Sequence, residues 1–329
     1  MYVGLDISKK QTVGVWKDEK GNKIAGEIFS TDEKGLKSLA EKLVGCEIAV
    51  EASTSGVFVY DYLTTQGLSV KVANPNTIKL ISHSDKKTDK SDAEKLADLL
   101  RTNLLPTCYL PDKKTRETRD LIRHRRALVN TKTVMKNKVR AILTRAGLNL
   151  PYKDVLGHRS LQWLHTADVG PVQKEAMNKF LYLALMINDD VHDYDRKLRF
   201  ECQKNDGAQL LETIPGIGYY SAMHIISAIG DINRFPSDEE LASYAGLVPR
   251  IYQSGETQYT RGLKQGEKSL KWILIECSHV AVRISKRFRK YYLKKLRKKN
   301  KQKAIVAVAR KMVEIIYCIL TRGEEYHES

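Results

Sequence analysis

Four acidic residues, Asp6, Glu51, Asp89 and Asp92, have types and positions that could assemble a metal-dependent site. Asp6 lies in the apolar run Y-V-G-L-D-I and Glu51 ends the run E-I-A-V-E, so each is expected on a buried strand. Asp89 and Asp92 start a predicted helix, and residues three apart share one helix face. Carboxylates gathered in this way repel one another unless a cation lies between them. Mg²⁺ suits this place because it prefers oxygen ligands (Mn²⁺ is an alternative), and two such ions about 4 Å apart can bind both oxygens of an in-line phosphoryl displacement.

The elements that would hold these carboxylates are predicted in the first 75 residues. Apolar patterning and turn residues predict strands at 2–7, 12–16, 23–30, 46–51 and 69–73, and helices at 32–43 and 57–66. Three antiparallel strands followed by alternating helix and strand is the order of the RNase H fold. That order would place Asp6 on the first strand beside Glu51 on the fourth. We therefore predict an α/β, RNase H-like nuclease domain over residues 1–111.

Two long helices are predicted in the middle of the chain. In residues 112–146, apolar residues recur every seven positions from Leu121 to Ile142, and Gly147 ends the pattern. Residues 172–204 carry a second apolar stripe with alternating spacings of three and four. We predict an antiparallel coiled-coil arm with its connector over residues 112–206, although an ordinary helical bundle satisfies the same pattern.

Residues 207–329 are predicted to form an all-α domain. The turn I-P-G-I-G at 214–218 lies between two helical stretches and is typical of a helix-hairpin-helix. Gly216 and Gly218 would let the backbone approach a phosphate, and the helix that follows offers free N–H groups to an anion. A tight turn between helices that binds no ligand is the alternative interpretation.

A second candidate for chemistry is Ser254, expected in a polar loop between two helical stretches. Most Ser-Gly pairs are turns, and no histidine stands nearby in the sequence as a partner. Arg250, Arg261 and Lys264 surround the serine and could hold a phosphate or favour loss of the hydroxyl proton.

The positive charge is confined to two helix-like stretches. The formal net charge is +17, while residues 112–146 carry +9 and residues 283–311 carry +14, so the rest of the chain is acidic. A polyanion is the expected partner because binding to phosphates releases counterions; two solvated helical faces are the alternative. The predicted nucleic-acid contacts are Lys87, Lys90, Arg123, Arg126, Gly216, Gly218, Arg250, Arg261, Lys264, Arg287 and Arg289.

Composition excludes several other classes of protein. Five cysteines stand far apart without a C-x-x-C pair, which argues against a zinc site and a disulfide framework. No apolar run reaches the roughly 18 residues that a membrane helix needs, and the sequence opens without the layout of a signal peptide. A cytoplasmic, nucleoid-associated protein is expected.

Over about its whole length the chain resembles the DEDD insertion-sequence transposases that include the Piv-type DNA invertases, described as bridge-RNA-guided recombinases. The motifs that carry the resemblance are G-L-D-I-S-K-K, V-E-A-S, K-T-D-K-S-D-A, I-P-G-I-G and L-A-S-Y-A-G-L-V-P-R-I-Y-Q-S-G. The resemblance implies a RuvC-like N-terminal domain, a coiled-coil arm and a helical transposase domain with a nucleophilic serine, which falls on Ser254. The stretch S-T-S-G-V-F after Glu51 departs slightly from the family form.

The resemblance also implies a mechanism and partners. Strand exchange would proceed through a DNA–serine intermediate at Ser254, with Mg²⁺ held by Asp6, Glu51, Asp89 and Asp92. The partners would be double-stranded donor and target DNA, a structured non-coding guide RNA, and further copies of the chain, as a dimer that assembles to a tetramer. Base pairing between the RNA and the DNA would then determine which DNA sequence is used. The protein would mainly contact the nucleic-acid backbone and recognise its shape.

Three other functions remain open from the sequence. A RuvC-like Holliday-junction resolvase would use the same carboxylates with water and would need no serine. A non-catalytic DNA- or RNA-binding protein would not need all four carboxylates intact. An actin-like ATPase shares a related sheet, but Ser8-Lys9-Lys10 stands where its phosphate loop would need glycine.

Overall fold

The computed structural model describes residues 1–75, 77–78, 88–254, 257–263 and 266–328, and for residues 250–254 and 257–262 the backbone alone. The chain divides into two compact units, Met1–Leu110 and Pro111–Ser329. Each unit has its own hydrophobic core. The first boundary lies close to the end predicted for the nuclease domain, and a further division at residues 206/207 stays a prediction.

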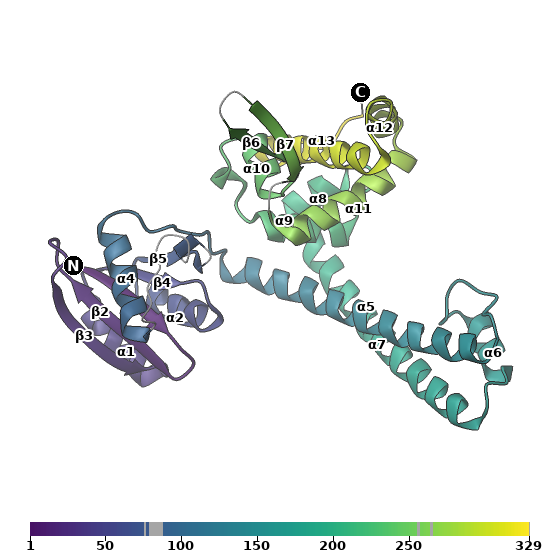
Figure 1. Ribbon diagram of the computed structural model, residues 1–329, viewed down its shortest axis with the longest axis horizontal. Coiled ribbons are helices and arrows are strands. Elements are labelled where there is room, and N and C mark those ends of the chain that lie inside the picture. The colour runs from purple at the N-terminus through teal and green to yellow at the C-terminus, as the bar shows by residue number, and fades with distance from the viewer. Residues whose placement is uncertain (76, 79–87, 255–256, 264–265, 329) are drawn as a thin grey trace. The chain divides into compact units, whose positions relative to one another are not determined.

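The first unit is built on a five-stranded sheet with the order β3-β2-β1-β4-β5 (Figure 1). The strands β1 (Tyr2–Ile7), β2 (Gln11–Lys17) and β3 (Lys23–Ser30) pair antiparallel. The strands β4 (Glu47–Glu51) and β5 (Val70–Ala73) run parallel to β1. The predicted neighbourhood of the first and fourth strands is therefore confirmed.

Helices cover both faces of this sheet. The helices α1 (Glu33–Lys42) and α2 (Thr54–Thr65) pack their apolar residues against Val3, Leu5 and Val50 on one face. The helix α4 (Asp89–Arg101) packs on the opposite face, against Ala49 and Val15. Thr88 and Ser91 form a capping box at the start of α4, which fixes the first helical turn where two of the acidic residues lie.

Two long antiparallel helices open the second unit. They are α5 (Lys113–Arg145) and α7 (Pro171–Gln203), and the short helix α6 (His158–Thr166) lies in their connector (Figure 1). Arg125 forms a two-pronged ion pair with Asp195, at 2.9 and 3.2 Å, which ties the two helices together. The predicted pair of long helices is confirmed, whereas the coiled-coil geometry of their contact stays a prediction.

The rest of the second unit is mostly helical and surrounds one apolar core. Its helices are α8 (Asp206–Glu212), α9 (Tyr219–Ile229), η1 (Ile232–Arg234), α10 (Asp238–Tyr244), α11 (Lys268–Ile284), α12 (Lys286–Leu296) and α13 (Lys301–Arg322). The apolar stripe of α13 is buried, and from Val308 to Ile319 it belongs to this core. Packing against α8, α10, α11 and α12 makes α13 the central helix.

The prediction that residues 207–329 are all-α is wrong between α10 and α11. There, β6 (Pro249–Ser254) and β7 (Thr257–Leu263) form a two-stranded antiparallel hairpin, where a polar loop was expected. The physical reason is local composition: Ile251, Tyr252 and Tyr259 are β-branched or aromatic residues that favour strands. A two-residue connection that begins with a glycine suits a tight hairpin turn.

Among the described helices, none combines the length and apolar character that crossing a membrane requires.

Candidate functional site

Asp6 lies within electrostatic reach of the other three predicted carboxylates in the first unit. Asp6 is on β1, Glu51 is the last residue of β4, and Asp89 and Asp92 are in the first turn of α4. Burial, followed by the negative charges of Asp89, Asp92 and Glu51 in that order, raises the pKa of the Asp6 carboxyl to about 6. The site therefore holds an excess of negative charge around Asp6.

A glycine on β1 sets the distance between α4 and the sheet. A Cβ atom added to Gly4 would lie 2.0 Å from the carbonyl oxygen of Ala93 and 2.6 Å from the amide nitrogen of Ala97. Gly4 and Asp6 alternate onto the same face of the strand, and Ala93 lies one turn after Asp89 on the helix. Backbone contact at Gly4 thus brings the acidic first turn of α4 toward Asp6.

The carboxylates suit a divalent cation although their side chains stand apart. Among the described residues, no three His, Cys, Asp or Glu side chains converge closely enough to bind a metal ion as they stand. Asp92 turns instead to Lys95, whose Nζ lies 3.0 Å from Oδ1. The donors are all carboxylate oxygens, which hard cations prefer, and a cation would relieve the repulsion that raises the pKa of Asp6. The chemistry of the residues present therefore fits a hard divalent cation.

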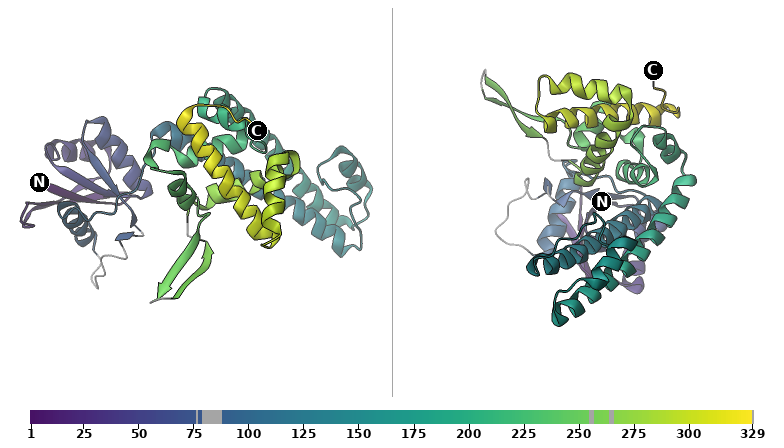
Figure 2. Two further views of the ribbon diagram at one scale, coloured as in Figure 1. Left: turned by 90° about the horizontal axis from the view of Figure 1, so that it is seen from above. Right: turned by 90° about the vertical axis from the view of Figure 1, so that its right-hand side faces the viewer.

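Ser254 lies at the tip of the β6–β7 hairpin. It pairs in register with Thr257 on β7, and Figure 2 shows the hairpin extending away from the helices of its unit. The side chains of Ser254, Arg250 and Arg261 lie outside what the structure describes, as do residues Lys87 and Lys264 altogether. The backbone alone establishes that the serine is carried on a projecting strand.

Two glycines form the neck of this hairpin. A Cβ atom on Gly266 would lie 2.4 Å from the amide nitrogen of Gly246, so the two ends of the hairpin are in close backbone contact. Beside them, the Glu267 N–H donates to the Tyr244 carbonyl at 2.8 Å. The hairpin is therefore anchored at a narrow, closed base.

The turn between α8 and α9 uses its two glycines differently. Gly216 has φ +94°, and a Cβ atom there would lie 2.6 Å from the Cys277 carbonyl oxygen, so this glycine lets the turn pack on α11. Gly218 faces open space and starts α9 without a side-chain cap. Of the two, Gly218 leaves N–H groups at the helix start available to an anion.

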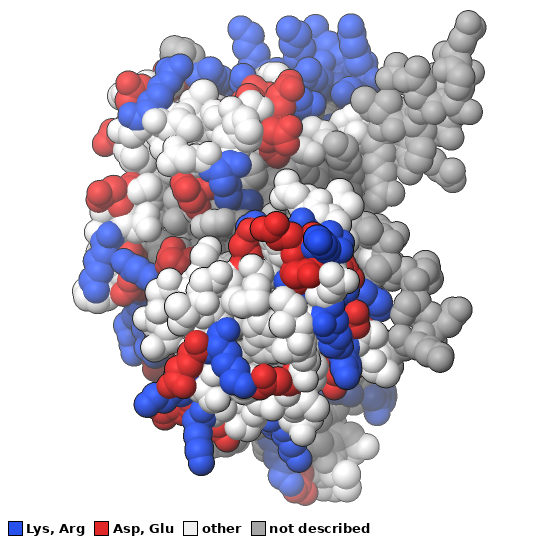
Figure 3. Space-filling view, turned by 90° about the vertical axis from the view of Figure 1, so that its left-hand side faces the viewer, with Lys and Arg blue, Asp and Glu red and all other residues white. Residues whose placement is uncertain are grey.

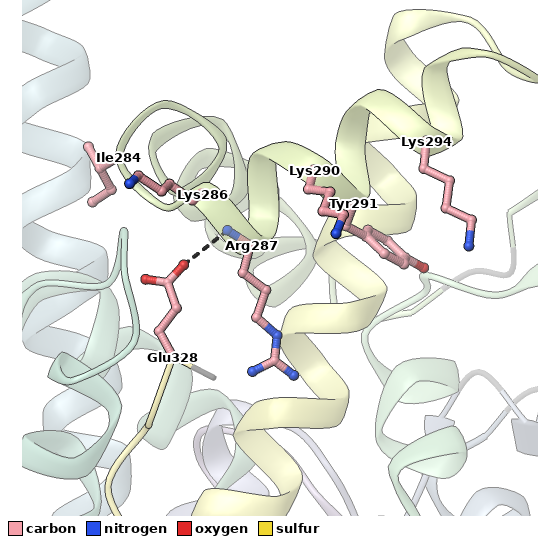
Figure 4. A pocket seen from close by; sticks show the side chains of 7 residues that line it. All are labelled: Ile284, Lys286, Arg287, Lys290, Tyr291, Lys294 and Glu328. Carbon is pink, nitrogen blue, oxygen red and sulfur yellow. Dashed lines mark hydrogen bonds between the residues drawn. The ribbon is translucent and has the colours of Figure 1, made fainter.

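The helix α12 lines a basic groove of about 710 Å³. Figure 4 shows Lys286, Arg287, Lys290, Tyr291 and Lys294 along it, together with Glu328. The Glu328 Oε1 atom accepts hydrogen bonds from the Ser285 hydroxyl at 2.6 Å and from the Arg287 N–H at 3.0 Å. A carboxylate thus lies at the N-terminus of the basic helix, where a phosphate would also be stabilised.

The two units differ in charge. Residues 1–110 hold 15 Lys and Arg and 15 Asp and Glu, so the whole excess of +17 lies in residues 111–329. Figure 3 shows a face of the molecule on which acidic and basic side chains are interspersed. Among the predicted nucleic-acid contacts that the structure describes, only Lys90 belongs to the first unit, and its side chain is exposed.

Sequence reasoning missed two residues that position the carboxylates. The first is Gly4, whose place in G-L-D beside an acidic residue was a visible signal. The second is Lys17, a buried cation that contacts α4 through Glu94 and Asp98. A lysine at the end of the apolar run V-G-V-W-K was its only sequence signal, and its partners lie about 80 residues away.

Two models of protein families match the chain. Residues 3–147 match the model described as a transposase of the DEDD, IS110 type, and residues 208–293 match the model of the IS116/IS110/IS902 transposase family. Together the matches cover more than half of the 329 residues, including both candidate regions, the acidic residues and the serine hairpin.

Individual relatives agree with these matches. The transposase for insertion sequence element IS1111A of Coxiella burnetii is 28% identical over 98% of this chain and 90% of its own length. The transposase for IS1328 of Yersinia enterocolitica is 23% identical over 98% of this chain and 97% of its own. The pilin gene-inverting protein of Moraxella bovis is 38% identical over 37% of this chain and 39% of its own.

Proposed function

Because the chain belongs to the IS116/IS110/IS902 family of DEDD transposases, we propose that it exchanges DNA strands through a covalent intermediate on Ser254, assisted by divalent cations. The observation that carries the proposal is the placement of Asp6 on β1, Glu51 at the end of β4, and Asp89 and Asp92 in the first turn of α4, where the charges of the other three raise the pKa of Asp6. Repulsion among four neighbouring carboxylates lowers the stability of a fold unless a bound cation offsets their charge.

The acidic residues act as the cation site in this proposal. Asp6, Glu51, Asp89 and Asp92 hold the metal, which is Mg²⁺ by preference and Mn²⁺ as a substitute. The bound cation supplies Lewis-acid stabilisation of negative charge on the phosphate and on the leaving oxygen. To hold a cation, Asp92 would have to turn away from its ion pair with Lys95.

Ser254 supplies the nucleophile. Its Oγ attacks a backbone phosphorus, so a serine–phosphate bond forms, the bond from phosphorus to the 3′ oxygen breaks, and the serine proton passes to the departing 3′-hydroxyl through solvent. A 3′-hydroxyl of the partner strand then attacks the phosphoserine and releases the serine. Each step exchanges one phosphodiester for another, so no ATP is required.

A structured guide RNA and a tetramer of this chain complete the proposal. The support is the location of charge: the basic residues lie along helices, such as Lys290 and Lys294 on α12, which suits contacts to backbone more than readout of bases. Sequence choice then belongs to base pairing between the RNA and the two DNA sites. Each serine hairpin meets the carboxylates of its own or of another copy in the assembled complex.

Trapping of covalent DNA tests the proposal. Full-length protein with its RNA and labelled DNA in Mg²⁺ is expected to give an adduct that survives denaturation, and Ser254→Ala is expected to give none. Thr257→Ala, which removes the hydroxyl across the hairpin from Ser254, is the matched control and keeps the adduct.

Asp6→Asn is expected to lose the adduct while it still binds nucleic acid. An undiminished adduct from Ser254→Ala would overturn the role of the serine. Cleaved DNA without any adduct, from wild-type protein, would select the RuvC-like resolvase that uses water.

A further inference from the structure

We propose that a small cavity beneath the serine hairpin binds a backbone phosphate of the nucleic acid and so fixes the neck of the hairpin. The inference rests on the proposed function of Ser254 and adds a positioning site to it. The cavity has a volume of about 180 Å³ and lies between α5, α9 and the start of α11. That volume admits a phosphate group and excludes a duplex.

Arginines dominate the wall of this cavity. Arg119, Arg123 and Arg126 line it from successive turns of α5, with Glu267 as the acidic residue among its described lining residues. The Glu267 carboxylate already accepts hydrogen bonds from the N–H and the hydroxyl of Ser269 at the start of α11. The cavity is therefore cationic, and an anion is its matching ligand.

Arg126 is held in place by an aromatic ring. Its guanidinium lies 4.4 Å from the centre of the Trp272 ring, and it makes no hydrogen bond or ion pair with the part of the chain that the structure describes. The neighbouring Arg125, by contrast, donates two hydrogen bonds to the Asp195 carboxylate. A stacked arginine with free N–H edges is oriented to bind an oxyanion in two-pronged fashion.

The other two arginines have different tasks. Arg119 donates to the carbonyl oxygens of Ser227 and Ala228, at 2.6 and 3.1 Å, so it provides hydrogen-bond donors for carbonyl groups in the last turn of α9. Arg123 is largely exposed and pairs weakly with Asp120 at 3.3 Å. Arg126 is accordingly the residue whose removal tests ligand binding with the least damage to the fold.

A buried histidine offers a second unmet polar group at the same place. His224 lines the cavity and is 4% exposed, and its Nδ1 atom has no hydrogen-bond partner in the described structure. Burial and then the charge of Arg126 lower the pKa of His224 to about 4, so the ring is neutral at physiological pH. A neutral imidazole can donate one N–H to a phosphate oxygen. A bound phosphate would therefore have a hydrogen-bond donor in addition to the arginines.

The cavity touches both ends of the hairpin. Tyr244 and Glu267 line it, and they are the residues joined by the backbone hydrogen bond of 2.8 Å beside Gly246 and Gly266. A phosphate that bridges Arg126 and His224 would therefore lie against the base from which Ser254 projects. The backbone of the bound nucleic acid and the serine hairpin would then be fixed relative to each other.

Thermal unfolding of the full chain tests anion binding without any chemistry at Ser254. Inorganic phosphate and a short single-stranded oligonucleotide are each expected to raise the melting temperature of wild type above that in chloride of equal ionic strength. Arg126→Gln is expected to lose most of the phosphate-dependent rise. Arg196→Gln, which removes one exposed charge from α7, is the matched control and keeps it.

The yield of covalent DNA adduct separates the inference from the proposed function. At saturating DNA, Arg126→Gln is expected to form the adduct at least tenfold more slowly than wild type, whereas Arg196→Gln forms it at the wild-type rate. An Arg126→Gln protein with an unchanged phosphate response and adduct rate would overturn the inference and leave the proposed function standing.

The source of the phosphate is distinguished by the two ligands. If inorganic phosphate stabilises the protein through Arg126 but the oligonucleotide response is unaffected by Arg126→Gln, the site takes a free anion and the inference is wrong. If wild type forms no adduct while the phosphate response depends on Arg126, the anion site stands and the role of Ser254 fails.

Discussion

The Nζ atom of Lys17, at the end of β2, lies 2.6 Å from Oδ2 of Asp98 and 3.1 Å from Oε1 of Glu94 on α4. Lys17 is 5% exposed, whereas both acidic side chains are about 40% exposed. One buried cation thus ties two successive turns of α4 to the sheet. The helix that carries Asp89 and Asp92 is positioned by this contact and by the close approach at Gly4.

Replacing Lys17 with methionine is expected to lower the free energy of unfolding by about 1 kcal/mol, because the partners keep contact with water. Urea unfolding measures the change. Lys42→Met, which breaks the exposed pair with Glu27, is the control and is expected to change stability by less than about 0.5 kcal/mol. Equal effects of the two variants would contradict the anchoring role.

The same contact gives a pH dependence with a defined sign. The hydrogen bond from Lys17 is the main cause that lowers the pKa of Glu94. A carboxyl with a lowered folded pKa stabilises the fold above its unfolded pKa, and the stabilisation is lost as the pH falls. Acidification from about pH 5 to about pH 3 should therefore destabilise wild type more than Lys17→Met.

Asp6→Asn is expected to stabilise the metal-free protein at pH 8 by about 1 kcal/mol while it abolishes activity. The pKa of Asp6 is raised to about 6, so its ionisation costs stability as the pH rises through that value. Below about pH 4 the variant and wild type should be equally stable.

Unfolding at several pH values, with and without MgCl₂, measures the effect of Asp6. Mg²⁺ is expected to raise the stability of wild type at pH 8 and to leave Asp6→Asn nearly unchanged. A stability difference between the two proteins that stays constant from pH 4 to pH 8 would show that the pKa of Asp6 is not raised in the folded protein.

Gly4→Ala is expected to destabilise the first unit by about 2 kcal/mol or more, because its Cβ would meet the Ala93 carbonyl oxygen at 2.0 Å. Thermal unfolding followed by circular dichroism measures the loss. Gly157→Ala is the control, since a Cβ there has no neighbour closer than 3.5 Å. Wild-type stability in Gly4→Ala would mean that α4 does not rest on β1.

Glu328→Gln is expected to tighten duplex DNA binding roughly two- to fivefold at low salt. The substitution removes a negative charge from the N-terminus of α12, where it accepts the Arg287 N–H at 3.0 Å. Fluorescence anisotropy against salt concentration measures the affinity. Glu325→Gln removes the same charge from a neighbouring position and should have a smaller effect; equal gains would point to net charge alone.

The sequence predicted the first unit well because its signals are local. The strand β1 (Tyr2–Ile7) and the helix α1 (Glu33–Lys42) have clear apolar periods, and the strand order narrows the topology to one familiar fold. The same topology predicts that Asp6 and Glu51 lie on neighbouring strands, and β1 and β4 do pair. The sequence indicates that these carboxylates repel one another, but it does not indicate how far the pKa of Asp6 is raised.

What the sequence could not supply depends on contacts between distant residues. The ion pair of Lys17 with Asp98 spans 81 positions, and the stacking of Arg126 on Trp272 joins separate helices. Neither has a periodic signal. The hairpin around Ser254 is hard to predict for another reason: residues 250–263 are polar overall, which is typical of a loop, although several of them favour strands.

The even balance of 15 positive and 15 negative side chains in residues 1–110 has a kinetic consequence. Long-range attraction to DNA comes from the other unit, so ionic strength should govern how fast a substrate is captured. Once the DNA is bound at saturation, turnover by the acidic residues should vary little with added monovalent salt. Capture and reaction would then be separately adjustable, the one by the ionic medium and the other by the divalent ion.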